Sequence, residues 1–218
     1  PFIATGRSPA ETRDIMESAN IHSGIFMNGQ VVLYQGERVF SSEIPTETVE
    51  RFHQMVKEDG YGLTAYNDKK FYLVESSEGA RDAYGFIHSN PPALNADFYK
   101  ENPINMMLFI SLPPAEEKYK VAFPNLDFLR NTPYSVDVIS KGNSKAEGIK
   151  RFLEHLNQED AETYAFGDGP NDIEMLQAVT HPVAMGNALP VLKEIAEFIT
   201  TNNTDNGIVN GLKHYGLI

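Results

Sequence analysis

The sequence has no cysteine, no long apolar run and no surplus of basic residues. Without cysteine it can form neither a disulfide nor a thiolate metal site, which fits the reducing cytoplasm that we expect as its compartment. No apolar stretch approaches the ~18 residues of a membrane-spanning helix, so we expect no membrane partner. The 18 Lys and Arg against 30 Asp and Glu give a net charge of -12. This argues against binding to nucleic acid, because no basic surface is available to release its counterions.

The 218 residues divide into three segments by their pattern of expected elements. Residues 1–44 and 138–218 alternate short apolar strands with amphipathic helices, which is typical of a parallel α/β core. Residues 45–137 contain shorter strands and helices, as in an α+β domain. We therefore expect an α/β fold in which a Rossmann-like parallel core is interrupted by an inserted α+β domain.

The first apolar strand begins at the first residues of the sequence and runs into a turn at Thr5-Gly6. Parallel strands in the middle of a sheet have neighbours on both sides. We therefore expect about 30 further residues, one strand-helix unit, upstream of Pro1. A helix follows over residues 8–20, since Ser8, Pro9 and Glu11 suit its N-cap, first turn and capping box.

The most informative stretch is residues 164–172, where an apolar strand leads into a turn with two carboxylates, Asp168 and Asp172. A surface turn is one interpretation, because Gly, Pro, Asn and Asp are turn residues. The other is a ligand site, since open parallel sheets bind ligands at the carboxyl ends of their strands. A carboxylate in that place suits Mg²⁺, which prefers hard oxygen ligands.

Two further positions have a possible phosphate-binding role. Thr5, Gly6 and Arg7 follow the first strand, where the hydroxyl and main-chain N–H groups can donate to a phosphate. The alternative is an ordinary strand-to-helix turn. Lys145 is the first residue of a helix with Ser144 as its N-cap, where a cation is unfavourable without a nearby anion. A bound phosphate supplies that anion, whereas the alternative is an exposed lysine with a solvated charge.

Together these residues resemble the haloacid dehalogenase superfamily, specifically its Cof-type branch with an inserted α+β cap. Residues 3–7 match the second motif, residues 144–149 the third and residues 167–172 the fourth, and residues 184–188 are also typical of the family. The resemblance implies a Mg²⁺-dependent phosphatase that hydrolyses a small phosphorylated metabolite through an aspartyl-phosphate, with the cap closing over the site. Sugar phosphates are the substrates that it implies.

The resemblance also assigns roles. Asp168 is expected to ligate Mg²⁺, and Asp172 to support the same metal site through a bound water. Thr5, Gly6, Arg7, Lys145 and Asn171 are expected to contact the phosphate, and Thr5, Lys145, Asp168 and Asp172 to form the catalytic set.

One motif of the family has no counterpart here. The 218 residues contain no Asp-x-Asp, which in the family holds the nucleophile and the general acid/base. We expect both residues upstream of Pro1 and the present chain to be inactive by itself. Two alternatives stay open: a phosphotransferase or mutase on the same scaffold, and a degenerate phosphate-binding module without catalysis. A receiver-like signalling domain is a weaker third, since such domains carry no cap of this size.

Overall fold

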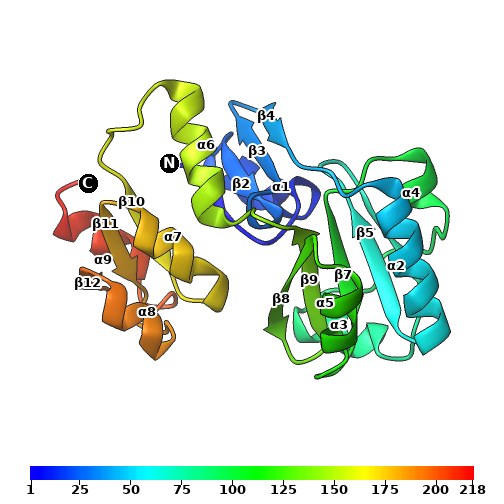
Figure 1. Cartoon of the computed structure of the whole chain (residues 1–218). Coiled ribbons are helices and arrows are strands. Elements are labelled where there is room, and N and C mark those ends of the chain that lie inside the picture. Colours follow the sequence, from blue (N-terminus) through cyan, green and yellow to red (C-terminus); the bar gives the residue numbers. More distant parts are fainter. The chain divides into compact units, whose positions relative to one another are not determined.

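The computed structural model describes residues 1–218, with the exception of the Asn131 side chain. The chain forms two compact units, Pro1–Asn143 (unit 1) and Ser144–Ile218 (unit 2), and Figure 1 shows the elements of each. The domain limits expected from the sequence were residues 1–44, 45–137 and 138–218. The limit after residue 137 falls inside strand β9 (Ser135–Ser140), and that three-part division stays a prediction.

Unit 1 begins with a four-stranded sheet in the order β1-β2-β3-β4. Its elements are β1 (Ile3–Ala4), α1 (Pro9–Ala19), β2 (Gly24–Phe26), a 3-10 turn (Met27–Gly29), β3 (Val31–Tyr34) and β4 (Glu37–Ser41). Strands β1 and β2 are parallel, and the remaining pairs are antiparallel. Helix α1 has the predicted capping box, because Glu11 Oε2 accepts from Ser8 N at 2.8 Å and from Ser8 Oγ at 2.7 Å.

The rest of unit 1 is an antiparallel sheet in the order β6-β5-β7-β9-β8, which we call the cap sheet because it lies in the segment predicted to form the cap. Its elements are α2 (Thr46–Asp59), β5 (Gly62–Tyr66), β6 (Phe71–Glu75), α3 (Ala80–Phe86), α4 (Phe98–Glu101), β7 (Met106–Ile110), α5 (Glu116–Ala122), β8 (Leu126–Thr132) and β9. Side chains alternate between its faces. Met107 and Phe109 of β7 pack under α2 and α5, whereas Met106 packs with Phe26 and Met27 of the first sheet. The cap sheet is therefore buried on both faces.

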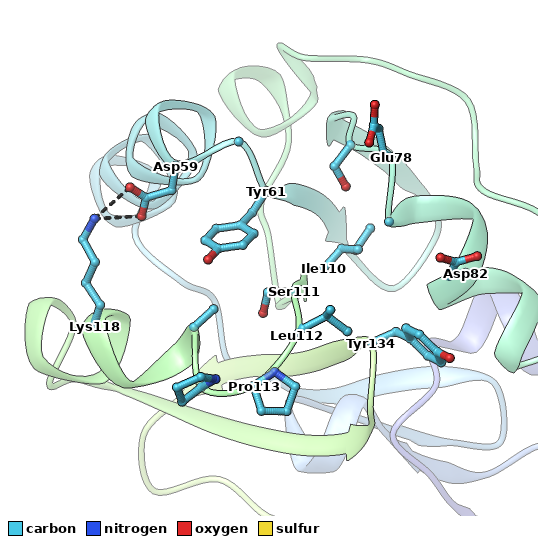
Figure 2. Close-up of a pocket in the computed structure, with 15 residues that line it drawn as sticks. Asp59, Tyr61, Glu78, Asp82, Ile110, Ser111, Leu112, Pro113, Lys118 and Tyr134 are labelled. Atoms are coloured by element: carbon cyan, nitrogen blue, oxygen red, sulfur yellow. Dashed lines mark hydrogen bonds and ion pairs between the residues drawn. The ribbon is translucent and has the colours of Figure 1, made fainter.

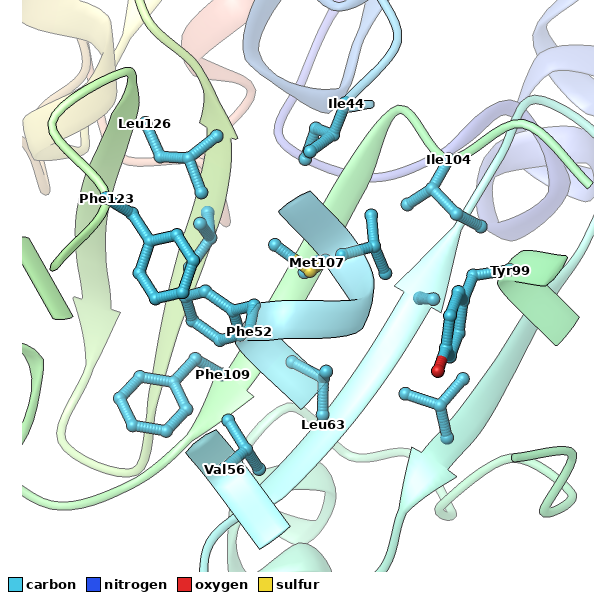
Figure 3. Close-up of a cluster of buried hydrophobic side chains, with 14 of the residues drawn as sticks. Ile44, Phe52, Val56, Leu63, Tyr99, Ile104, Met107, Phe109, Phe123 and Leu126 are labelled. Atoms are coloured by element: carbon cyan, nitrogen blue, oxygen red, sulfur yellow. The ribbon is translucent and has the colours of Figure 1, made fainter. Parts of the chain in front are cut away.

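The centre of the cap core is Phe52 of α2, which is fully buried (Figure 3). Its ring centroid lies 5.6 Å from that of Phe109, 5.0 Å from those of Tyr119 and Phe123, and 6.2 Å from that of Phe128. Aromatic pairs at such separations contribute beyond the burial of their area. One ring thus joins α2 to α5 and to the strands below them.

Replacing Phe52 by Ala should lower the free energy of unfolding of unit 1 by about 3–5 kcal/mol, because the cavity left behind adds to the lost burial. Urea unfolding followed by circular dichroism measures the loss. Phe52→Leu is the matched control and should be less destabilising, since it keeps most of the buried volume. An Ala variant as stable as the Leu variant would contradict the central place of this ring.

Unit 2 is a parallel sheet in the order β10-β11-β12 with helices between its strands. Its elements are α6 (Lys145–Leu156), β10 (Tyr164–Gly167), a 3-10 turn (Pro170–Asp172), α7 (Ile173–Ala178), β11 (His181–Ala184), α8 (Pro190–Ile195), β12 (Phe198–Ile199) and α9 (Gly207–His214). The helix expected from residue 171 therefore starts as a 3-10 turn. Helix α9 packs closely on β10, because a Cβ on Gly211 would collide with the ring of Phe166.

The expected strands and helices are present, with their ends shifted by a few residues. Helix α4 was not expected, since it lies in the Pro- and Asn-rich stretch of residues 89–103. Strand β1 is half-buried, because it stands first in its sheet and pairs with β2 alone among the described strands. Over the described residues, no helix has the length and apolar character needed to cross a lipid bilayer.

Candidate functional site

Asp168 lies directly after strand β10, at the carboxyl end of the parallel sheet of unit 2. Open parallel sheets bind their ligands at this end. The Asp168 side chain is exposed, and its Oδ2 accepts a hydrogen bond of 2.8 Å from Asn187 Nδ2. Asn187 follows the neighbouring strand β11, and its Oδ1 accepts from the N–H of Asn203 at 3.0 Å. The carboxylate of Asp168 is therefore oriented by an amide that is itself held in place.

A buried ion pair joins Lys145 to Asp172 in the same unit. Lys145 Nζ lies 2.6 Å from Asp172 Oδ1, and the two side chains are 7% and 8% exposed. Asp172 Oδ2 accepts from the main-chain N–H groups of Asp168 and Gly169, at 3.0 Å each. A buried carboxylate needs such charged and main-chain donors. The pair thus connects the loop that carries Asp168 to the first turn of α6.

The burial of Lys145 excludes one of the two interpretations of this residue. It is 6% exposed, so the view that it is an exposed, solvated lysine is wrong. Helix α6 begins as predicted, since Ser144 Oγ accepts from the N–H of Glu147 at 3.3 Å. The carboxylate of Asp172 is the anion that a cation at a helix start requires. The phosphate expected beside Lys145 stays a prediction.

The loop after β10 packs closely because residue 167 is glycine. A Cβ on Gly167 would lie 2.7 Å from Asp172 Cβ and would displace that side chain. Asn171 is half-buried in the 3-10 turn that follows. The structure therefore brings four predicted residues of unit 2 onto one loop and one helix start: Lys145, Asp168, Asn171 and Asp172.

The other predicted residues, Thr5, Gly6 and Arg7, follow strand β1 in unit 1. Thr5 Oγ1 accepts a hydrogen bond of 3.1 Å from the N–H of Arg7. The main chain of Thr5 is bound on both sides, with its N–H donating to Ile25 O at 2.9 Å and its carbonyl accepting from Asn28 N–H at 3.1 Å. The loop is therefore fixed to the chain that leaves β2. The Arg7 amide, expected to donate to a phosphate, donates to Thr5 in this structure.

Two polar residues that the sequence analysis did not select lie beside Gly6. Asn28 Nδ2 donates to Asp137 Oδ2 at 3.0 Å. A Cβ on Gly6 would lie 3.3 Å from Asn28 Nδ2, Asn28 Oδ1 and Asp137 Oδ2. Asn28-Gly29 is a turn signal in the sequence. Asp137 has no such signal, because it is 109 residues away from Asn28 along the chain.

The site expected to bind Mg²⁺ contains one exposed carboxylate, Asp168. Over the described residues, no group of three or more His, Asp or Glu side chains is arranged to hold a metal ion. Mg²⁺ typically takes one or two carboxylates and completes its shell with waters and substrate phosphate oxygens, so the chemistry of Asp168 fits it. Both Asp172 oxygens have other partners, Lys145 and two main-chain N–H groups. Those partners suit a residue that positions the Asp168 loop.

A cavity of about 850 Å³ opens elsewhere in unit 1, and Figure 2 shows its lining. Tyr61 and Ile110 contribute apolar surface to its lining, and Asp59 and Lys118 contribute charged groups. Lys118 Nζ donates to both Asp59 oxygens at 2.8 Å, and this bond lowers the pKa of the Asp59 carboxyl although burial opposes the shift. None of the residues that line this cavity belongs to the candidate set.

Comparison with known families and proteins gives matches over almost the whole chain. A family model described as haloacid dehalogenase-like hydrolase matches residues 1–212. The "Putative phosphatase YkrA" of Bacillus subtilis (strain 168) is 36% identical over 218 residues, which cover 100% of this chain and 84% of the relative. "Phosphatase YwpJ" of the same organism is 25% identical and is matched over 91% of this chain and 67% of its own length.

Solved structures match equally widely. A hypothetical protein from Geobacillus kaustophilus HTA426 has a TM-score of 0.92 at 32% identity, covering 100% of this chain and 85% of the other. The HAD subclass IIB sugar phosphatase BT4131 has a TM-score of 0.85 at 28% identity, with the same coverage of 100% and 85%. These matches confirm the expected α/β fold. The inserted cap and the first core strand upstream stay predictions.

Proposed function

Because this chain belongs to the haloacid dehalogenase-like hydrolase family, we propose that it acts in the Mg²⁺-dependent hydrolysis of a small phosphorylated metabolite. The observation that carries the proposal is the buried Lys145–Asp172 pair, which holds the Asp168 loop at the carboxyl end of the parallel strands. The names of the relatives support it, since both Bacillus subtilis proteins are named phosphatases. A phosphomonoester such as a sugar phosphate is the proposed substrate, in line with the sugar phosphatase among the matched structures.

We assign the metal to Asp168, the exposed carboxylate that Asn187 orients. Bound there, Mg²⁺ would neutralise charge on the phosphoryl group and fix its orientation. Asp172 keeps the loop in place through its bonds to the main chain, and Lys145 adds positive charge next to it. Because phosphoryl transfer relies mainly on positioning and charge stabilisation, such fixed groups are the contribution expected of a protein.

The phosphate-binding role falls to the loop after β1 and to Asn171. The Thr5 hydroxyl and the Gly6 N–H are proposed to donate to non-bridging phosphate oxygens, with Arg7 adding positive charge at this exposed position. Asn171 is proposed to donate its side-chain amide. The main-chain bonds that fix Thr5 to Ile25 and Asn28 support this role, because a donor held rigidly needs little reorganisation.

The covalent step needs a nucleophile, which the family carries in an Asp-x-Asp motif. The 218 residues contain no such motif, so we place the nucleophile upstream of Pro1. One carboxylate oxygen of that aspartate attacks phosphorus, and the bond from phosphorus to the ester oxygen breaks. The leaving oxygen takes a proton from the second aspartate of the motif. Water, deprotonated by the same residue, then attacks phosphorus; the bond from phosphorus to the aspartate oxygen breaks, which releases inorganic phosphate and restores the carboxylate.

Removing divalent cations tests the proposal directly. With the complete product of the gene and p-nitrophenyl phosphate as substrate, excess EDTA should lower phosphate release by about a hundredfold or more, because a metal contributes several kcal/mol of charge stabilisation. Added Mg²⁺ should restore the rate, and Ca²⁺ should restore it less, since Ca²⁺ is larger and prefers more ligands. No release from the folded, Mg²⁺-supplied protein would reject the phosphatase.

A further inference from the structure

The Asp137 carboxylate lies beside the loop that we assign to phosphate binding. Asp137 belongs to β9, which pairs with β7 and β8 in the middle of the cap sheet. Its Oδ2 is 3.3 Å from the position that a Cβ on Gly6 would occupy. The inserted segment thus places one carboxylate directly against the Thr5–Gly6 turn.

Asn28 holds this carboxylate and the loop in a fixed relation. Its Nδ2 donates to Asp137 Oδ2 at 3.0 Å, and its main-chain N–H donates to Thr5 O at 3.1 Å. Asn28 is 1% exposed and has a φ of 54°, a left-handed conformation that Asn adopts more readily than most residues. One buried side chain therefore sets the distance between Asp137 and the phosphate loop.

The charge of Asp137 decides what it can bind. A carboxylate repels a phosphate, so Asp137 is unsuited to the phosphoryl group itself. It accepts hydrogen bonds, with about four acceptor positions on its two oxygens, and can bind a hydroxyl in addition to its protein donors. Next to the phosphate loop, the organic part of a bound phosphate ester can supply such a hydroxyl.

We propose that Asp137 is a specificity-determining residue that accepts a hydrogen bond from a substrate hydroxyl near the phosphoester, and that Asn28 positions it. The substrates are then polyhydroxy phosphomonoesters rather than apolar or aromatic ones. This inference rests on the proposed phosphatase function. A site built to bind a hydroxyl discriminates strongly against analogues that lack it, because its polar group is left unpaired.

The test compares glycerol phosphate with propyl phosphate, which differ only in their hydroxyls, using the complete gene product. The wild type should prefer glycerol phosphate in kcat/KM. Asp137→Asn and Asp137→Ala should lower this preference by about tenfold to a hundredfold, the usual worth of a hydrogen bond to a charged group. Asn28→Gly, which tolerates the positive φ, should lower the preference in the same direction.

Asp127→Asn is the matched control, because Asp127 is a half-buried carboxylate on the neighbouring strand β8. It should keep the preference for glycerol phosphate. If Asp137→Asn lowers kcat/KM equally for both esters, Asp137 has a purely structural role and the inference is overturned. An unchanged preference for glycerol phosphate would also overturn it. The same holds if p-nitrophenyl phosphate is hydrolysed but the wild type shows no preference. Failure to hydrolyse any of the three esters, glycerol phosphate included, would instead reject the phosphatase function itself.

Discussion

Asp168→Asn in the complete gene product should lower Mg²⁺-dependent kcat/KM by about a thousandfold, because the neutral amide removes the charge that we assign to the metal. The change keeps the size of the side chain. It also keeps the main-chain N–H of residue 168, which bonds to Asp172. The free energy of unfolding should therefore stay within about 0.5 kcal/mol of the wild type, as for most exposed substitutions.

The measurement is phosphate release as a function of Mg²⁺ concentration for wild type and variant. If Asp168 ligates the metal, a higher Mg²⁺ concentration should recover part of the lost rate. If its role is structural, added Mg²⁺ should recover none of it. Asp160→Asn is the control, since Asp160 is an exposed carboxylate of the same unit outside the candidate loop. It should leave the rate unchanged. A fully active Asp168→Asn enzyme would show that this carboxylate takes no part in catalysis.

Lys145→Met should lower the free energy of unfolding of unit 2 by about 3–5 kcal/mol, because it leaves the Asp172 carboxylate buried without its cation. The side chains of Lys145 and Asp172 are 7% and 8% exposed, so water cannot replace the lost partner well. Exposed ion pairs contribute only about 0–1 kcal/mol, so the size of the loss in stability distinguishes a buried ion pair from an exposed one. Urea unfolding of the 218-residue chain is the measurement.

Two further variants isolate the ion pair. Lys150→Met changes an exposed lysine of the same helix and should be nearly neutral. The double variant Lys145→Met with Asp172→Asn should recover part of the stability, since the neutral amide oxygen can still accept from the main chain. A loss for Lys145→Met no larger than that for Lys150→Met would mean that the pair does not hold the loop.

Local signals in the sequence predicted the helix starts well. Ser8 and Glu11 form the capping box at the start of α1, with Pro9 in its first turn, and Ser144 caps α6 through the N–H of Glu147. These contacts join residues three positions apart, so the chain determines them locally. Helix α4 was missed because four residues in a Pro- and Asn-rich stretch carry no periodic apolar pattern. Such a short helix depends on packing, and both Phe98 and Tyr99 are buried in the cap core.

Part of the candidate site was also readable from the sequence. Asp168 and Thr5 each follow an apolar strand, and strand ends in parallel sheets are where ligands bind. Asn187 belonged to a stretch typical of the family, but its bond to Asp168 was not foreseen. That bond connects the ends of two different strands and depends on their parallel register.

Local sequence signals predicted most of the strands and helices, the capped starts of α1 and α6 and the loops that hold Thr5 and Asp168, because these follow from contacts a few residues apart. The burial of Lys145 against Asp172, 27 residues away, and the bond between Asn28 and Asp137 across 109 residues depend instead on the tertiary fold. Polar pairs of this kind have no periodicity in the sequence. They form where packing brings distant elements together and excludes water. A polar group buried in this way is stable only with a hydrogen-bond partner from the protein.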